Sequence, residues 1–216
     1  MNYRGIFFDF DYTLGDATDS IVAGFQNAFS KMGRPVPDRE AIRATIGYLL
    51  EDAYTLLSGD LTPEGRAAFR PYYQEAALPT QLQGIDLFPG TAELLRGLHK
   101  AGVKLAIVSS RRSLTIERTL EGAGLSDAVE FVIGSTDVKR HKPDPEGLLL
   151  AMDRLGLKPE EVLYCGDTVL DAGAAKNAGC PFCAVLNGTT READFAPYPS
   201  VHVAPDLFDL AAWLGL

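Results

Sequence analysis

The chain has 216 residues, 46% of them hydrophobic, which is enough for one substantial α/β domain or a domain that carries a smaller second one. Acidic residues outnumber basic ones by 29 to 20 and no long basic stripe occurs, so nucleic acid is not expected as a partner. An anionic substrate would then need a local cluster of cations or a metal ion. With no membrane-length apolar stretch and no leader pattern, we expect a cytoplasmic protein that does not bind membranes.

A short buried strand is predicted at residues 4–9, and a block with helical patterning follows it. Apolar residues recur at helical spacing from Ile21 to Met32, and Gly33 and Pro35 end that run. Further helices are predicted at 38–46, 50–57 and 63–77. This block therefore looks entirely helical.

After Gly84 the pattern changes to strands that alternate with helices. Strands are predicted at 103–108, 130–133, 162–165, 182–186 and 201–203, and helices at 91–100, 113–124, 145–156, 172–178 and 206–214. The strands are almost continuously hydrophobic, as in strands buried on both faces, which predicts a doubly wound parallel sheet with right-handed crossovers. Residues 1–15 and 83–216 would form this α/β core, with residues 16–82 as a helical insertion.

Ligands of such sheets bind outside the carboxyl ends of the strands. Asp9 and Asp11 follow the first strand, where one carboxylate could attack phosphorus and the other could donate a proton to the leaving group. A helix cap or an acidic turn would explain an isolated pair of this kind equally well.

Two more polar positions follow predicted strands. Ser109 and Ser110 precede a helix, where hydroxyl and backbone N–H groups can bind an anion, although serine there is most often only an N-cap. Lys142 precedes Pro143 at the start of another helix and could neutralise phosphate oxygens, or simply be a surface charge.

Asp167 stands at the end of the strand at 162–165, in the position that Asp9 takes on its own strand. A hard cation such as Mg²⁺ could bridge the two carboxylates. Asp171 lies one helical turn further and could hold metal-bound water or Lys142. A capped helix is the alternative interpretation.

In this order and at these strand ends, the motifs closely resemble those of the haloacid dehalogenase superfamily of phosphatases. The residues that match the pattern are Asp9, Asp11, Thr13, Ser109, Lys142, Asp167 and Asp171. The insertion at 16–82 is similar to the small C1-type cap domain of that family. Residues 87–90 look like the return to the core in phosphoglycolate phosphatase-like members.

The resemblance implies roles for these residues. Asp9 would form an aspartyl-phosphate, and Asp11 would protonate the leaving oxygen and then deprotonate the attacking water. Mg²⁺ would be held by the side chains of Asp9 and Asp167 and by the backbone carbonyl of Asp11. The residues expected to bind the phosphoryl group are Thr13, Ser109, Ser110 and Lys142.

One departure from the family pattern is Tyr12, which stands where most relatives carry glycine. Its N–H can still donate to phosphate, while its ring would narrow the pocket or face the cap. Asp11 argues against a dehalogenase and against a phosphonatase, which both lack this residue. Phosphonatases also use a cap lysine as a Schiff base, and Lys31 is the only lysine at 16–82. A mutase of the β-phosphoglucomutase type would carry an arginine shortly after Gly47.

We therefore expect a Mg²⁺-dependent, phosphoglycolate phosphatase-like enzyme that hydrolyses a small phosphorylated metabolite as a monomer or homodimer. Cap closure would select the substrate through Gly47, Tyr48 and Arg43. The alternatives are a phosphomutase and a non-catalytic, phosphate-binding member of the fold.

Overall fold

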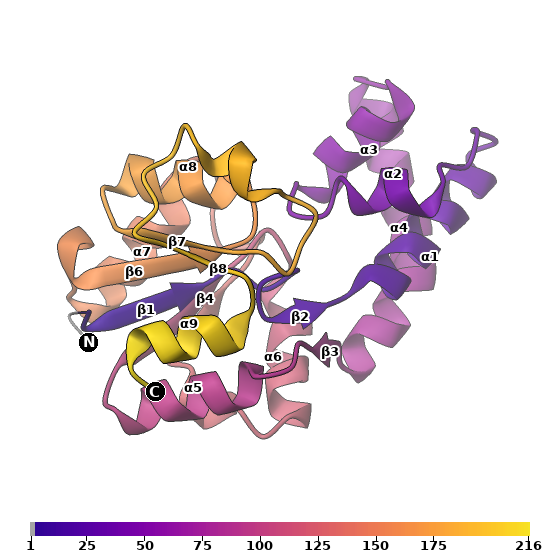
Figure 1. The fold of residues 1–216 in the computed structure, drawn as a ribbon. Coiled ribbons are helices and arrows are strands. Elements are labelled where there is room, and N and C mark those ends of the chain that lie inside the picture. Colours follow the sequence, from indigo (N-terminus) through magenta and orange to yellow (C-terminus); the bar gives the residue numbers. More distant parts are fainter. Residues whose placement is uncertain (1–2) are drawn as a thin grey trace.

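A six-stranded parallel sheet forms the centre of the computed structural model, which describes residues 3–216 (Figure 1). Its strands follow the order β5-β4-β1-β6-β7-β8. They are β1 (Gly5–Phe8), β4 (Lys104–Val108), β5 (Phe131–Ile133), β6 (Val162–Gly166), β7 (Phe182–Val185) and β8 (His202–Ala204). All six predicted strands are present, each within one or two residues, so the predicted fold class is confirmed.

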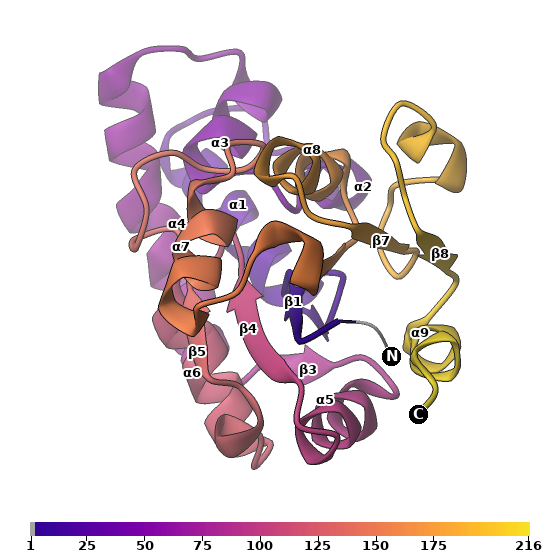
Figure 2. The same ribbon diagram turned by 90° about the vertical axis from the view of Figure 1, so that its left-hand side faces the viewer.

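Helices cover both faces of the sheet (Figure 2). They are α5 (Thr91–Lys100), α6 (Ser113–Gly122), α7 (Glu146–Leu155), α8 (Val169–Ala178) and α9 (Leu207–Leu214), with short 3₁₀ turns at Ser126–Ala128, Pro159–Glu161 and Glu192–Phe195. Side chains alternate across each strand, so Phe8 packs with the layer of α5, α6 and α9, and Phe7 packs with α7 and α8. This double burial explains the continuous hydrophobicity of the strands.

The register of the sheet brings three loops together at one edge. Phe8, the last residue of β1, lies opposite Ile107 of β4 and Cys165 of β6. The next residue, Asp9, continues the ladder with an N–H that donates to the carbonyl of Cys165 at 2.9 Å. The residues that follow β1, β4 and β6 therefore meet at the carboxyl edge of the sheet.

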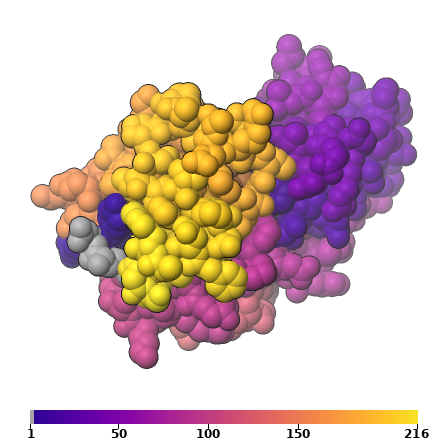
Figure 3. All heavy atoms as spheres, viewed as in Figure 1, coloured from indigo at the N-terminus to yellow at the C-terminus, as the bar shows by residue number. Residues whose placement is uncertain are grey.

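A separate block of helices lies beyond this edge (Figures 1 and 3). It contains α1 (Thr18–Lys31), α2 (Arg39–Arg43), α3 (Leu50–Ser58) and α4 (Pro63–Gln83). Two chain segments join it to the core, and they pair as an antiparallel ribbon of β2 (Gly15–Asp16) and β3 (Asp86–Leu87). Strands of two residues carry no measurable periodicity, so these two were not predicted from the sequence. The domain boundary at 16–82 remains a prediction.

Two helices differ from their predicted lengths. The helix α4 does not end at residue 77 but continues to Gln83 with Pro71 and Pro79 inside it. Its close packing on α1 provides a reason, because a Cβ on Gly24 of α1 would lie 2.6 Å from the ring of Tyr73. Such tertiary contact compensates for the backbone hydrogen bonds that proline removes. In contrast, α2 spans only Arg39–Arg43 of the predicted 38–46.

An aromatic cluster fills the interior of this block. Its members are Phe25, Phe29, Tyr54, Phe69 and Tyr73. Phe69 is the central ring, 4.7 Å from Tyr54 and 5.1 Å from Phe25 between ring centroids. Within residues 3–216, no helix is long and apolar enough to cross a membrane.

Replacement of the central ring should destabilise the protein strongly. We expect Phe69→Ala to lower the free energy of unfolding by about 3–5 kcal/mol, because it removes a fully buried ring and leaves a cavity. Denaturation in urea measures this loss. Leu61→Ala, at a side chain that is 76% exposed, is the matched control and should change stability by less than about 0.5 kcal/mol. Equal effects of the two changes would contradict the central role of Phe69.

Candidate active site

Asp9 occupies the first position after β1 and is almost completely buried, with 1% of its surface exposed. Its Oδ2 lies 3.0 Å from Nζ of Lys142. Its Oδ1 is buried and has no hydrogen-bond partner among residues 3–216. A buried carboxylate oxygen without a partner is energetically costly, so this atom is available for a ligand.

Lys142 lies between two carboxylates. Besides Asp9, its Nζ contacts Oδ1 of Asp171 at 2.6 Å and the hydroxyl of Tyr164 at 3.4 Å. Burial alone would lower the pKa of Lys142, but the charges of Asp171 and Asp9 outweigh it and raise the pKa above its ordinary value. The lysine is therefore a permanent positive charge beside the end of β1.

Both carboxylate oxygens of Asp171 have hydrogen-bond partners within the protein, and Lys142 is one of them. Its Oδ1 lies 2.9 Å from the hydroxyl of Tyr164, and its Oδ2 accepts hydrogen bonds from the N–H of Thr168 at 3.0 Å and from the Thr168 hydroxyl at 2.5 Å. The reciprocal hydrogen bonds between Thr168 and Asp171 cap the N-terminus of α8. The predicted contact of Asp171 with Lys142 is present, and the capped helix proposed as its alternative is present as well.

Asp167 follows β6 and lies beside Asp9, as the sequence predicts. Carboxylate oxygens of Asp9, Asp167 and Asp171 all lie within 4.8 Å of one another, and all three residues are buried. Oδ1 of Asp167 accepts a hydrogen bond from the hydroxyl of Thr13 at 3.2 Å. Thus Thr13 holds a carboxylate in this structure.

Both Asp9 and Asp167 have raised pKa values, because they are buried and lie close to other negative charges. Burial and the nearby charges of Asp171 and Asp9 raise the pKa of Asp167 well above its ordinary value. The positive charge of Lys142 lowers this pKa, but only in part. Burial also raises the pKa of Asp9 to about 6, against the opposing effect of Lys142. Because both oxygens of Asp171 are occupied, Asp9 and Asp167 are the side chains that fit a hard divalent cation.

Asp11 has a partner that the sequence did not reveal. The Nε of Arg111 donates to its two oxygens at 3.0 and 2.9 Å, and Nη2 donates to Oδ1 at 2.8 Å. Both side chains are largely buried, at 6% exposed for Arg111 and 12% for Asp11. The sequence shows Arg111 directly after the two serines, but its partner stands 100 residues away and is visible only in the fold.

The two serines lie at the same edge of the sheet. Ser109 is buried, and its hydroxyl accepts a hydrogen bond from the N–H of Arg111 at 3.3 Å. Ser110 lines the cavity between the core and the helical block. Both serines are thus close to the end of β1, and their predicted contact with phosphate stays a prediction.

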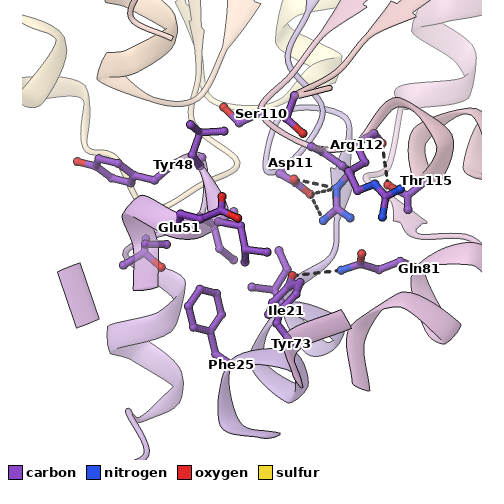
Figure 4. A pocket seen from close by; sticks show the side chains of 18 of the residues that line it. Asp11, Ile21, Phe25, Tyr48, Glu51, Tyr73, Gln81, Ser110, Arg112 and Thr115 are labelled. Carbon is purple, nitrogen blue, oxygen red and sulfur yellow. Dashed lines mark hydrogen bonds and ion pairs between the residues drawn. The ribbon is translucent and has the colours of Figure 1, made fainter. Parts of the chain in front are cut away.

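The cavity in front of Asp9 and Asp11 has a volume of about 100 Å³ (Figure 4). Gly47 and Tyr48 line it from the loop between α2 and α3. Gly47 has a φ of 104°, and a Cβ there would lie 2.7 Å from Cγ2 of Thr168, so the loop touches the core beside α8. The space-filling view shows the same close approach of the helical block to the C-terminal half of the core (Figure 3).

Tyr12 faces the helical block, one of the two orientations expected for it. Its hydroxyl lies 2.8 Å from that of Thr18 and accepts a hydrogen bond from Nε of Arg43 at 3.1 Å. Its N–H donates to the carbonyl of Gly15 at 2.9 Å, which gives no support to a hydrogen bond from this N–H to phosphate. Its φ of 57° explains why glycine is common at this position.

Arg43 does not line the cavity in this structure. Its guanidinium contacts Tyr12 and Glu40 instead. This placement gives no support to the predicted contact of Arg43 with substrate, whereas Gly47 and Tyr48 do reach the cavity wall.

Comparisons with known proteins agree with this geometry. The model of the haloacid dehalogenase-like hydrolases matches residues 6–185. A phosphoglycolate phosphatase of Salmonella typhi is 34% identical over 213 residues, with 87% of this chain and 83% of that protein covered. The probable phosphatase IndB of Dickeya dadantii is 39% identical, with 81% and 77% covered.

A solved structure shows the same fold over nearly the whole chain. The crystal structure of a haloacid dehalogenase-like hydrolase from Bacteroides fragilis superposes with a TM-score of 0.93 at 38% identity and covers 96% of this chain and 99% of its own. The chain therefore belongs to the haloacid dehalogenase-like hydrolase family, as a phosphatase of its phosphoglycolate phosphatase-like group.

Proposed function

We propose that the protein hydrolyses a small phosphate monoester through an aspartyl-phosphate formed on Asp9, with Mg²⁺ as cofactor. The observation that carries this proposal is the buried Asp9, whose Oδ2 contacts Lys142 while Oδ1 has no partner among residues 3–216. A carboxylate held in this way is oriented, and its charge is partly balanced before substrate arrives.

Two displacements at phosphorus complete the reaction. In the first, an oxygen of Asp9 bonds to phosphorus as the bond to the ester oxygen breaks, and Asp11, after taking up a proton from solvent, gives that proton to the leaving oxygen. In the second, Asp11 takes a proton from water, whose oxygen bonds to phosphorus and displaces the Asp9 carboxylate. The products are the alcohol and inorganic phosphate, and both aspartates return to their starting state.

Charge balance is the main contribution of the surrounding residues. Lys142, fixed by Asp171 and Tyr164, would offset the charge of the transferring phosphoryl group, and Ser109 and Ser110 would add donors after β4. Asp9, Asp167 and the backbone carbonyl of Asp11 would hold Mg²⁺, which supplies charge neutralisation at the phosphoryl oxygens.

The helical block is proposed as the cap that excludes water and selects the substrate. Gly47 and Tyr48 line a cavity of about 100 Å³, which suits a small leaving group. Phosphoglycolate is the first substrate to test, since it is named for the Salmonella relative. A mutase gains no support, because Tyr48 rather than an arginine follows Gly47. The cytoplasmic location and the monomeric or dimeric state remain predictions.

Loss of the nucleophile should abolish turnover. We expect Asp9→Asn to lower kcat for p-nitrophenyl phosphate by about 10³-fold or more, because it removes the carboxylate that is proposed to accept the phosphoryl group. Acid quench and mass spectrometry should find the phosphoryl adduct on Asp9 in the wild-type protein and none in the variant. Asp127→Asn, at an exposed residue of a 3₁₀ turn, is the control and should retain wild-type activity. Phosphorylation at another residue would refute this assignment.

Asp11→Asn should separate proton transfer from metal binding. Only the backbone carbonyl of Asp11 is proposed to ligate Mg²⁺, so the variant should bind the ion within about threefold of wild type while breakdown of the aspartyl-phosphate slows by about 10²–10⁴-fold. Calorimetric Mg²⁺ titration and single-turnover kinetics measure the two quantities. Complete loss of Mg²⁺ affinity in Asp11→Asn would argue against the role given to its side chain.

The metal site can also be tested without turnover. Burial raises the pKa of Asp9 to about 6 from an ordinary value of 3.8, so the folded protein binds this proton more tightly than the unfolded chain does. The tighter proton binding by Asp9 therefore stabilises the folded protein fully at pH values below 3.8, and this stabilisation is lost as the pH rises through about 6. At about pH 7 this proton has largely dissociated, so Mg²⁺ should bind the ionised carboxylate and raise Tm; at about pH 4.5 the proton competes with Mg²⁺, and the rise should be smaller.

The matched control for this experiment is Asp9→Asn, which lacks the titrating group. Its Tm should respond less to Mg²⁺, and its response should depend less on pH. A wild-type Tm that Mg²⁺ leaves unchanged at both pH values would exclude the proposed site.

A further inference from the structure

We propose that Arg111 recognises a carboxylate on the leaving group of the substrate. This carboxylate replaces Asp11 as the hydrogen-bond partner of the Arg111 guanidinium, and Asp11 is then free for proton transfer. The inference rests on the proposed function and names its substrate class: small phosphate monoesters with a carboxylate next to the ester carbon.

The first observation is that Arg111 already binds a carboxylate. Three hydrogen bonds of 2.8–3.0 Å join its Nε and Nη2 to the two oxygens of Asp11. Bidentate pairing of this kind is strong and geometrically selective for planar carboxylates. Arg111 is thus a preformed carboxylate site, occupied in this structure by a side chain of the protein.

The second observation is the position of that site. Arg111 and Asp11 both line the cavity that also contains Asp9, and Figure 4 shows Asp11 on its wall. Asp11 must approach the ester oxygen to transfer its proton. A guanidinium that reaches Asp11 therefore lies beside the leaving group, where a carboxylate two bonds from the ester oxygen would meet it.

The third observation concerns the other charges of the cavity. Arg70 is paired with Glu51 within the helical block, and Arg111 is paired with Asp11. The guanidinium of Arg112 also lines the cavity and forms no ion pair with any residue in the described range 3–216. No acidic residue stands in the first turn of α6, which begins directly after it. Among the charged side chains of the cavity wall within residues 3–216, Arg112 is therefore the one without an ion-pair partner, since Asp9 is paired with Lys142.

The fourth observation is that Asp11 is restrained while it is bound to Arg111. Both of its oxygens accept hydrogen bonds from the guanidinium, and its side chain is only 12% exposed. A substrate without a carboxylate would have to break this pair with no replacement. A substrate with one would exchange one charged pair for another, so the two substrates should differ in kcat as well as in KM.

The experiment compares phosphoglycolate with 2-hydroxyethyl phosphate, which has the same chain length and a neutral end. With wild-type protein and Mg²⁺, we expect kcat/KM to favour phosphoglycolate by about 30-fold or more, with part of the preference in kcat. In Arg111→Met the preference should fall to about threefold or less, while p-nitrophenyl phosphate, which has no carboxylate, is still hydrolysed. Arg118→Met, at an exposed arginine of α6, is the control and should keep the wild-type preference.

Several outcomes would overturn the inference. A wild-type preference below about threefold would do so without any variant, as would an unchanged preference in Arg111→Met or a preference confined to KM. Should Arg111→Met not fold, Arg111→Lys is the second variant, because it keeps the positive charge but cannot form the bidentate hydrogen bonds of a guanidinium. A full wild-type preference in Arg111→Lys would also overturn the inference. The proposed function itself fails only if wild-type protein hydrolyses none of the three substrates, including p-nitrophenyl phosphate.

Discussion

The ion pairs of Lys142 with Asp9 and Asp171 are the interaction on which the rest of the site depends. Two carboxylates and an ammonium group are buried here at distances of 3.0 and 2.6 Å. Such a cluster is stable only when every charge has a partner, because desolvation of an unpaired ion costs several kcal/mol. Asp171 accepts hydrogen bonds from Thr168 and Tyr164. Within this cluster, Oδ1 of Asp9 is then the carboxylate oxygen without a hydrogen-bond partner among residues 3–216.

Sheet topology explains how the cluster forms. Lys142 comes from the segment before α7, Asp171 from α8, and Asp9 from the end of the central strand β1. The strands of the sheet are parallel and their following loops emerge at the same edge, so residues far apart in sequence meet there. The hydroxyl of Tyr164, a residue of β6, then lies 2.8 Å from the carbonyl of Val108, the last residue of β4.

The helical block contributes the wall of the cavity and a second set of contacts with the core. Tyr12 joins the loop after β1 to Arg43 of α2, and Gly47 touches Thr168 beside α8. Both contacts involve residues next to proposed catalytic groups. Movement of the helical block would therefore change the contacts of the loop that carries Asp11 and of the helix that carries Asp171.

The sequence by itself determined the sheet, its order of alternation with helices, and the short list of polar residues at the strand ends. Continuous hydrophobic runs are a local property of strands buried on both faces, and Asp9, Asp167 and Lys142 each follow or precede such an element. The structure brings these three together, and it places Asp171 on Lys142, one of the two roles that the sequence left open for it.

Only the tertiary structure decided which partner each charge takes. The pairing of Arg111 with Asp11, the pairing of β2 with β3, and the contact of Arg43 with Tyr12 join segments that no local pattern relates. The continuation of α4 through Pro71 and Pro79 likewise follows from packing on α1, which overrides a local tendency to stop. Local patterns fix elements because they depend on neighbours along the chain, whereas ion pairs depend on neighbours in space.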